Sequence, residues 1–449
     1  MFKPKESSQN EIEFVSIDEL VPSDHLLRKI DQYIDFSTIL DKVRPYYSED
    51  NGRPTDPLLL FKMMFIGYLY GIRSERQLEQ EIKMNIAYRW FLGLRFRDPV
   101  PHHSTISFNR QNRFKGTDIF QEIFDEVVLQ AINHKMVGGR VLFTDSTHLK
   151  ANANKHKFTK EEVKAHTRAY IDELDKAVEE DRQNHGKKPL KEREEVVETK
   201  KIRVSTTDPE SGFMSRENKQ EMFCYLDHRT TDMKFNIITD AFVTPGNVHD
   251  SVPYLSRLDR QTRRFGFKVE AVALDSGYLT NPICKGLSDR DIFAVIAHRR
   301  FHPTTGLFPK WKFTYDKDRD LYICPNKQEL IYRTTSREGY REYKSDSKQC
   351  GSCPFLSQCT RSKNKVKVIT RHVWEDDKEK VRQNRLSKSG KILYKFRKEK
   401  VERSFADSKE LHGLRYCRLR GLHNASEQVL LTAACQNMKK IAMHLAKLG

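Results

Sequence analysis

The sequence lacks any long uninterrupted apolar run. Its most apolar stretch, residues 58–72 (LLLFKMMFIGYLYGI), contains Lys62 and is shorter than the roughly 18 residues that a membrane-spanning helix needs. The first residues (MFKPKESSQNEIEF) carry lysines with no apolar segment behind them, so we expect no secretory signal peptide. These absences argue against a membrane or exported protein, and the apolar stretch is predicted to be a buried core helix.

Cysteine is also scarce, with 8 residues in 449. Four of them are scattered along the chain, at Cys224, Cys284, Cys417 and Cys435. This spacing favours reduced thiols in a cytoplasm over a disulfide framework.

Acidic residues are outnumbered by basic ones, 62 against 80, so the formal net charge is +18. This excess favours a polyanionic partner, while a merely basic soluble enzyme is the alternative. A chain of 449 residues is too long for one ordinary core and is expected to form two or three structural units.

Hydrophobic periodicity changes character along the chain. Residues 1–130 show helical periodicity with recurrent breaks and are predicted to be an all-helical domain. From residue 138 onward, short apolar runs bounded by turn residues predict five strands of an α/β domain. These runs are VLFTDS (141–146), MFCYLDH (222–228), FNIITDAFV (235–243), VEAVALDS (269–276) and DIFAVIAH (291–298).

Three other segments complete the predicted organisation. A Lys- and Glu-rich stretch at about 155–205 is expected to be a charged helical insertion, either a solvated helix face or a DNA-facing arm. Residues 300–375 form a second insertion that contains four cysteines. Residues 376–449 are predicted to be helical, with an apolar, core-facing end.

Two of the predicted strands end in aspartate. Asp145 closes VLFT, and Asp275 closes VEAVAL before a Ser276-Gly277 turn. A carboxylate at a buried strand end is costly unless it binds a cation, and ligands of open α/β sheets gather beyond the carboxyl ends of the strands. For either aspartate alone, a helix cap or a turn residue is the alternative. The pair favours a metal site.

Glu402 lies in a basic segment (394–421) that is predicted to begin as a helix. At 100° per residue, Lys409 lies only about 20° from Glu402, so one helix face offers a metal ligand beside a phosphate-binding cation. A solvated, charged helix face is the alternative. Three arginines follow in a turn-rich segment where a DNA backbone could pass. They are Arg415, Arg418 and Arg420.

The three carboxylates suit phosphodiester chemistry. Cleaving or transferring a phosphodiester requires an activated water or 3′-hydroxyl and neutralisation of the leaving oxygen, and two Mg²⁺ ions roughly 3.5 to 4 Å apart do both. Mg²⁺ takes oxygen ligands and keeps several waters, so a few carboxylates from distant parts of a chain suffice.

With these segments located, the chain resembles the DDE transposases of bacterial insertion sequences. The resemblance is to the superfamily with a Tyr-Arg-Glu-Lys signature, and most of all to its group numbered eleven eighty-two. It rests on the blocks GRPTDPLLLFKMMFIGYLYGIRSERQLEQEI (52–82), HHSTISFNR (102–110), FTDSTHLKAN (143–152), ALDSGY (273–278) and KVERSFADSKELHGLRYCRLRG (400–421). It implies that Asp145, Asp275 and Glu402 are the catalytic carboxylates and hold two Mg²⁺ or Mn²⁺ ions. It also implies an RNase H-like mixed sheet flanked by helices, split into residues 131–299 and 376–449.

The signature is matched with one departure. Lys409 stands in the place of the signature lysine, seven residues after Glu402, and Tyr394 and Arg397 match the other two letters. The usual pattern has the arginine four residues before the glutamate, where this chain has Lys398. On a regular α-helix Arg397 would lie about 140° from Glu402 and Lys398 about 40°, so either residue could make the phosphate contact.

The resemblance implies a DNA transposase. Such an enzyme binds the terminal inverted repeats of its element through the N-terminal helices, cleaves the ends and joins the 3′-hydroxyl to target DNA. It works as a homodimer or higher assembly on double-stranded DNA, in the bacterial cytoplasm at the nucleoid. The alternatives are a nuclease on the same core and a domesticated DNA-binding protein without catalysis.

Two further groups of residues invite a functional interpretation. Cys324, Cys350, Cys353 and Cys359 suit a tetrahedral structural zinc, although only one Cys-x2-Cys knuckle is present and a set of reduced cysteines is the alternative. Most histidines are expected to be surface or core residues. His228 and the pair His249-Asp250 lie in blocks that resemble the family, so a supporting role near the sheet is a minority hypothesis for them.

Overall fold

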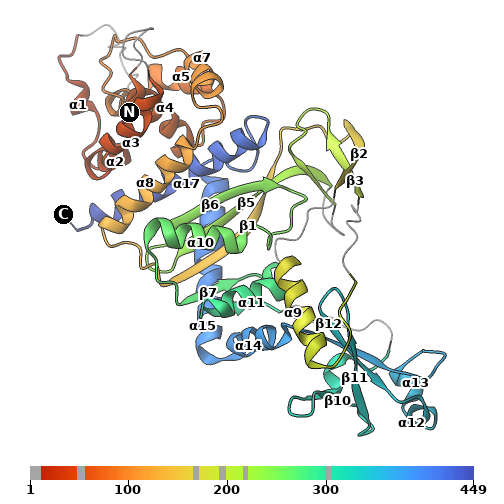
Figure 1. The fold of residues 1–449 in the computed structure, drawn as a ribbon. Coiled ribbons are helices and arrows are strands. Elements are labelled where there is room, and N and C mark those ends of the chain that lie inside the picture. The colour runs from red at the N-terminus through yellow and green to blue at the C-terminus, as the bar shows by residue number, and fades with distance from the viewer. Residues whose placement is uncertain are drawn as a thin grey trace, which may run out of the picture.

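A computed structural model describes residues 12–47, 56–164, 171–191, 199–215, 221–298 and 306–448. A helical N-terminal part, a central mixed sheet and a smaller antiparallel sheet follow one another in space (Figure 1). The mixed α/β architecture with a helical N-terminal region confirms this part of the predicted fold class. None of the helices in the described ranges is long and apolar enough to cross a lipid bilayer.

The described residues up to 133 form helices and turns, as predicted. The helices are α1 (Ile17–Leu20), α2 (Leu26–Tyr33), α3 (Ser37–Val43), α4 (Pro57–Leu69), α5 (Glu75–Met84), α6 (Ile86–Phe91), α7 (His103–Phe108) and α8 (Ile119–Asn133). α4 contains most of the apolar run that was predicted to be a core helix, and most of its residues are buried. It begins where the Asp56 carboxylate accepts a hydrogen bond from the Leu58 N–H and Pro57 occupies the first turn, a common helix start.

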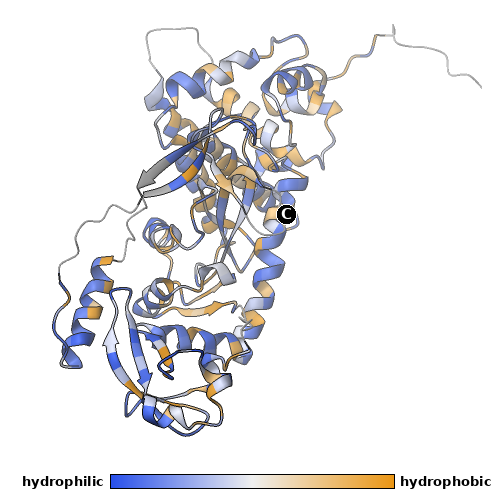
Figure 2. Cartoon of the chain, turned by 90° about the vertical axis from the view of Figure 1, so that its right-hand side faces the viewer, coloured by the Kyte–Doolittle hydropathy of each residue, from blue (hydrophilic) through white to orange (hydrophobic). Residues whose placement is uncertain are grey.

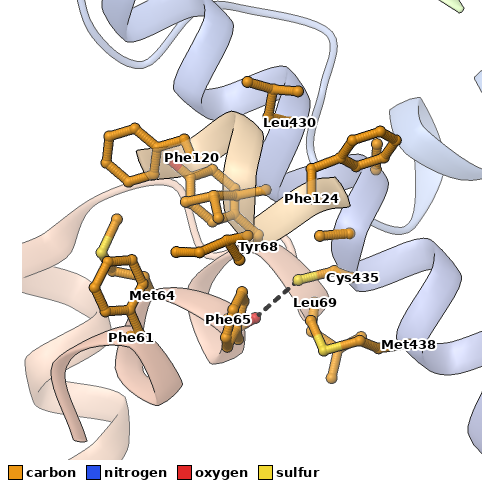
Figure 3. Close-up of a cluster of buried hydrophobic side chains, with 14 of the residues drawn as sticks. Phe61, Met64, Phe65, Tyr68, Leu69, Phe120, Phe124, Leu430, Cys435 and Met438 are labelled. Atoms are coloured by element: carbon orange, nitrogen blue, oxygen red, sulfur yellow. Dashed lines mark hydrogen bonds between the residues drawn. The ribbon is translucent and has the colours of Figure 1, made fainter. Parts of the chain in front are cut away.

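The N-terminal helices share their hydrophobic core with the C-terminal helix α17 (Leu422–Leu445). Phe65 and Tyr68 of α4 and Phe124 of α8 lie beside Leu430 and Cys435 of α17 (Figure 3). The Cys435 thiol donates a hydrogen bond to the Phe65 carbonyl (3.6 Å). Coloured by hydropathy, the chain shows its apolar segments where these helices meet the central sheet (Figure 2). A domain boundary at residue 130 would therefore divide one continuous hydrophobic core.

The central sheet has six strands, in the order β4-β5-β1-β7-β8, with β6 also paired to β5. β5 runs antiparallel to β1 and β6, whereas β7 and β8 run parallel to β1. All five strands predicted from the sequence are present, and β4 is an additional short strand. The strands are β1 (Val141–Lys150), β4 (Gly212–Met214), β5 (Met222–Asp232), β6 (Ile238–Pro245), β7 (Ala271–Leu274) and β8 (Phe293–Ile296).

Helices cover both faces of this sheet. On β1, Leu142 packs into one apolar cluster and Phe143 into another, as the alternation of side chains along a strand requires. The Leu142 cluster contains residues of the helices α10 (Tyr254–Phe265), α11 (Asn281–Asp289) and α14 (Glu375–Leu386). The Phe143 cluster contains residues of α15 (Lys388–Arg397), of α16 (Arg403–Glu410) and of the turn between them. Short 3₁₀ or π turns are η1 (Arg44–Tyr46), η2 (Asn109–Arg113), η3 (Ser276–Tyr278), η4 (Lys310–Lys312) and η5 (Lys398–Glu402).

The charged insertion between the first two predicted strands is only partly helical. It contains α9 (Ile171–Asn184), but β2 (Phe158–Lys164) and β3 (Thr199–Ser205) pair as an antiparallel ribbon. The prediction of a helical insertion was wrong for these two strands. Their sequences are rich in charged residues and lack the run of apolar residues by which a strand is usually predicted. Residues 165–170 and 192–198 lie outside the described part of the insertion.

The second insertion is a five-stranded antiparallel sheet in the order β13-β12-β11-β10-β9. Its elements are β9 (Thr314–Asp316), β10 (Leu321–Ile323), β11 (Glu329–Thr335), β12 (Tyr340–Ser345), α12 (Ser347–Gly351), α13 (Leu356–Cys359) and β13 (Val368–His372). α9 packs against this sheet, and its buried Asp181 forms an ion pair with Arg341 of β12 (2.5 Å). The two insertions therefore meet in space, although the sequence separates them.

Candidate active site

Two aspartates stand where the parallel pairing of β1 with β7 ends. β7 ends before Asp275, whereas β1 continues beside β5 to Lys150, so the prediction that Asp145 closes its strand was wrong. β1 and β7 pair in parallel, and Thr144 opposite Leu274 is their last pair. Asp145 and Asp275 are the next residues along the two strands, so the register places them side by side. β7 is buried throughout, as expected for parallel strands covered on both faces. The structure brings together the two aspartates that the sequence singled out.

Asp145 is a largely buried carboxylate in contact with a cation. Its side chain is 19% exposed, and Oδ2 accepts a hydrogen bond from the Arg397 guanidinium at 2.6 Å. Oδ1 accepts a hydrogen bond from the Ser146 N–H at 2.9 Å. The pKa of Asp145 is raised to about 6, chiefly by burial; the charge of Arg397 opposes this rise, and the charges of Asp275 and Asp250 contribute to it. A concentration of carboxylates therefore surrounds Asp145.

Glu402 reaches this site through an irregular helix. α15 ends at Arg397, and the π turn η5 leads to α16, which begins at Arg403. A π turn joins residues five apart instead of four, and such bulges in α-helices are frequent at functional sites. Arg397 stands five residues before Glu402, so this turn brings the two residues to the same side of the helix.

The Arg397 guanidinium lies between the first and third carboxylates. One nitrogen contacts Asp145 Oδ2, and another lies 3.8 Å from Glu402 Oε1. Lys398, by contrast, is exposed, with its ammonium 5.8 Å from the centre of the Tyr394 ring. Lys398 was an alternative to Arg397 for the phosphate contact only because a regular α-helix was assumed. The π turn at residues 398–402 changes that geometry in favour of Arg397. Arg397 is the basic residue that the structure places at the carboxylates.

A buried ion pair anchors α16 to the sheet. Arg229 of β5 is fully buried and donates a hydrogen bond to Asp227 Oδ2 at 2.6 Å. Its other terminal nitrogen donates to the Ser404 carbonyl and to the hydroxyls of Ser404 and Ser408. Gln436 of α17 donates to two of the same acceptors. These contacts fix the helix that follows Glu402, and the sequence analysis missed them.

Lys409 lies further along the same helix and reaches β1. Its ammonium donates a hydrogen bond to Thr147 Oγ1 at 2.6 Å, two residues beyond Asp145. Burial lowers the pKa of Lys409, and the negative charge of Asp227 opposes this effect. The predicted pairing of Glu402 and Lys409 on one helix therefore places a cation beside the extension of β1.

Asp250 is a further acidic residue at the site. Its Oδ1 accepts a hydrogen bond from the Ser146 hydroxyl at 2.7 Å. The sequence signal was the pair His249-Asp250 in a block that resembles the family. For Asp227 and Arg229, the signal was an Asp-His-Arg triplet directly after the apolar run of residues 222–226. Such charges have to find partners when the strand is buried.

The basic segment after α16 divides into exposed and inward-facing arginines. Arg415 and Arg420 are exposed, with Arg415 paired to Glu410. Arg418 instead lies over the Tyr68 ring, 4.5 Å from its centre, and contacts the α4 backbone. A pocket of about 520 Å³ is lined by Tyr416 and Arg420 together with residues 151–154. Arg415 and Arg420 are therefore more accessible for contact with a DNA backbone than Arg418 is.

The four cysteines of the second insertion gather at one end of its sheet. They carry free thiols and are partly exposed. Cys324 and Cys359 pack against the same apolar cluster. Burial raises the pKa of Cys359, and the other three cysteines raise it further, so all four lie near one another. In the described residues, however, no three of these sulfur atoms lie within 4.8 Å of one another.

One group in the described residues has metal-ligand spacing, and it does not include Asp145, Asp275 or Glu402. It consists of Glu79, His102 and His103, where α5 meets the start of α7. The Glu79 carboxylate already accepts hydrogen bonds from Lys83 (2.5 Å) and from both the backbone and the ring of His103 (2.9 and 2.7 Å). This carboxylate is satisfied by the protein and ties α7 to α5.

Two segments match known domain families. Residues 15–112 match the family described as transposase domain (DUF772), and residues 323–442 match the family described as transposase DDE domain. These matches support a DDE transposase. The DDE match contains Glu402 and Lys409, whereas Asp145 and Asp275 lie outside both matched segments. No curated protein shows significant similarity to the chain.

Two solved transposase structures are distantly similar to this chain. One is a piggyBac transposase synaptic complex with hairpin DNA, at 9% identity and a TM-score of 0.36, covering 94% of this chain and 75% of that one. The other is a Mos1 transposase paired-end complex with the left transposon end, at 9% identity and a TM-score of 0.16, covering 56% and 61%. Both likenesses are too distant to bear on the details of this chain.

Proposed function

We propose that the protein is a DNA transposase of a bacterial insertion sequence, in the group numbered eleven eighty-two. It would bind the terminal inverted repeats of its element, cleave the phosphodiester bonds at the ends and join the 3′-hydroxyl to target DNA. One observation carries the proposal. Asp145 and Asp275 directly follow the last residue pair of the parallel strands β1 and β7, and Arg397 contacts both Asp145 and Glu402. The mixed sheet, with β5 antiparallel and β7 and β8 parallel to β1, supports an RNase H-like core for this site.

The donor set at the site fits Mg²⁺ or Mn²⁺. Asp145, Asp275 and Glu402 offer only carboxylate oxygens, which hard divalent cations prefer. The pKa of Asp145 is raised chiefly by burial and also by the nearby charges of Asp275 and Asp250, so a bound cation would stabilise its ionised form. Two such ions, when bound, supply an activated oxygen nucleophile and neutralise charge on the leaving oxygen.

The side chains around these carboxylates suit a phosphate backbone. Arg397 holds Asp145 and Glu402 near each other and presents the planar guanidinium geometry that matches phosphate oxygens. Lys409 lies beyond Asp145 along β1 and adds a point charge for an adjacent phosphate. The Tyr394 ring supports Arg397 from 5.6 Å. Arg397, in preference to Lys398, is therefore proposed as the arginine of the signature.

Other parts of the chain would hold the DNA and the partner subunits. Arg415, Arg420 and the net charge of +18 favour sequence-independent contacts with double-stranded DNA. The N-terminal helices are proposed to recognise the element ends. A homodimer or higher assembly is needed because two ends must be paired. The cysteine-bearing sheet is proposed to be a zinc-stabilised module, and the site of action is the nucleoid in the bacterial cytoplasm.

The proposal is tested by cleavage of DNA that carries the inverted repeats flanking the gene. Wild-type protein with Mg²⁺ should cut at the repeat ends, and Asp145→Asn, Asp275→Asn and Glu402→Gln should each abolish cutting. Asp289→Asn is the matched control, because this partly exposed carboxylate on α11 pairs only with Lys285 in the described residues and should leave cutting unchanged. Unchanged cutting by Asp275→Asn would disprove the assignment of the catalytic carboxylates.

A further inference from the structure

Asp250 lies between the two segments that follow the paired aspartates. Its Oδ1 accepts the 2.7 Å hydrogen bond from Ser146, the residue after Asp145. Its Oδ2 lies 3.4 Å from the position that a Cβ on Gly277 would occupy, two residues after Asp275. The carboxylate therefore contacts β1 just after Asp145 and lies close to the turn after Asp275.

The local turn does not use the Asp250 carboxylate. The turn before α10 is closed by His249, whose ring nitrogen accepts from the Ser251 N–H (3.3 Å) and contacts the Ser251 hydroxyl (2.7 Å). α10 begins after Pro253 without any side-chain cap. Among the described residues, no cation lies within ion-pair distance of Asp250. A role as helix cap or ion-pair partner therefore does not explain its position.

A small cavity lies beside Asp250. It measures about 10 Å³, and its lining includes Asp250, His228, Tyr254 and Tyr278. This volume suits about one water molecule. The last three residues are at least nine-tenths buried. Their His228 Nδ1, Tyr254 Oη and Tyr278 Oη atoms have no hydrogen-bond partner within the protein.

The three residues with unpartnered atoms line the same cavity as Asp250. Buried polar atoms normally find partners, so three of them around one cavity mark a site that takes up a polar occupant. Tyr278 belongs to the turn directly after Asp275 and is close enough to Asp145 and Asp250 to be affected by both charges. The cavity, the Ser146 hydrogen bond and the Gly277 contact together fix where the Asp250 carboxylate lies.

We propose that Asp250 is a fourth carboxylate of the metal site and supplies an oxygen ligand to the divalent cation held by Asp145 and Asp275. This inference rests on the proposed function. Ser146 orients Asp250 through Oδ1, which leaves Oδ2 for the cation. Ser146 is a positioning residue, because it acts through Asp250.

The test is Mn²⁺ binding to purified full-length protein without DNA, measured by calorimetry and by electron paramagnetic resonance. Asp250→Asn should weaken Mn²⁺ binding by about tenfold or more, the size of effect known for groups that support a metal site. Ser146→Ala should weaken it less, because only the orienting hydrogen bond is lost. Asp289→Asn, which also removes one carboxylate from this part of the molecule, should bind Mn²⁺ as the wild type does.

The outcomes separate this inference from the proposed function. If Asp275→Asn loses Mn²⁺ while Asp250→Asn binds as the wild type does, the inference is wrong and the proposed function stands. If Asp145→Asn and Asp275→Asn also bind as the wild type does, the metal site itself is refuted. Should Asp250→Asn fail to fold, as judged by circular dichroism, Ser146→Ala decides, and an unchanged affinity in that variant overturns the inference.

Discussion

Replacing Arg229 with methionine should destabilise the protein by about 3 to 5 kcal/mol, the usual cost of removing one partner of a buried ion pair. The change removes the 2.6 Å contact with Asp227 and the hydrogen bonds to Ser404 and Ser408. Both members of the ion pair have fully buried side chains. Burial already raises the pKa of Asp227, and Arg229 is the charge that opposes this rise. Without Arg229, Asp227 must be protonated or remain as an uncompensated buried charge.

The double variant Asp227→Leu/Arg229→Met separates the lost ion pair from lost packing. Replacing both partners of a buried ion pair by apolar residues is often neutral or stabilising, so the double variant should recover at least half of the lost stability. Urea unfolding followed by circular dichroism measures both variants, and hydrogen exchange reports on α16. A loss below about 1 kcal/mol in the single variant, or no recovery in the double variant, would refute the reasoning.

Three further predictions concern other parts of the molecule. Burial lowers the pKa of His372 and of His412 to about 4, from 6.5. As the pH falls, the unfolded chain therefore binds protons before the folded chain does. Urea unfolding should show the free energy of unfolding falling between pH 6.5 and 4, by up to about 2 kcal/mol per histidine after allowance for solvent screening. Replacing each histidine by Gln should flatten this decline, and an unaltered pH profile would contradict the prediction. Arg397→Lys should slow DNA cleavage at least tenfold because Lys lacks the planar fork, whereas Lys398→Ala should retain it, and the reverse order would restore Lys398 as the phosphate contact. Metal analysis should find one zinc per chain, lost in Cys353→Ser, and well under one zinc per chain in the wild type would remove the zinc module.

The strands that carry the paired aspartates were predictable because two physical signals coincide in them. An apolar run long enough for a buried strand is followed at once by an aspartate at both Asp145 and Asp275, although a turn follows only Asp275 and β1 continues past Asp145. The relative position of the two strands was not predictable from the residues alone. It depends on the parallel pairing of β1 with β7, which connects segments separated by about 130 residues.

The position of Arg397 could not be predicted, because helical periodicity assumes a constant turn. A one-residue excess between Arg397 and Glu402 looks like a broken signature on a regular helix. The π turn absorbs the extra residue and restores the contact. Residues on both sides of this turn, in α15 and α16, pack in one apolar cluster with β1 and β7.

Charge alone misjudged two other features. Arg418 resembles its exposed neighbours in sequence, but it packs on Tyr68 of α4, a residue about 350 positions away. The charged segment at 155–205 gave no apolar signal for β2 and β3, whose pairing depends on backbone hydrogen bonds. Arg418 contacts a residue far away in the chain, and β2 and β3 pair through their backbones. The pattern of side chains along a segment predicts neither kind of contact.

Strand transfer tests the central claim most directly, because a transposase joins DNA whereas a nuclease on the same core only hydrolyses it. The assay combines wild-type protein, Mg²⁺, pre-cut element ends with a free 3′-hydroxyl and a supercoiled target plasmid. We expect covalent joining of the ends to the plasmid, no joining when the ends carry a 3′-deoxy terminus, and no joining by Asp275→Asn. Hydrolysis of the ends without joined products would contradict a transposase, and joining by Asp275→Asn at the wild-type level would contradict the site.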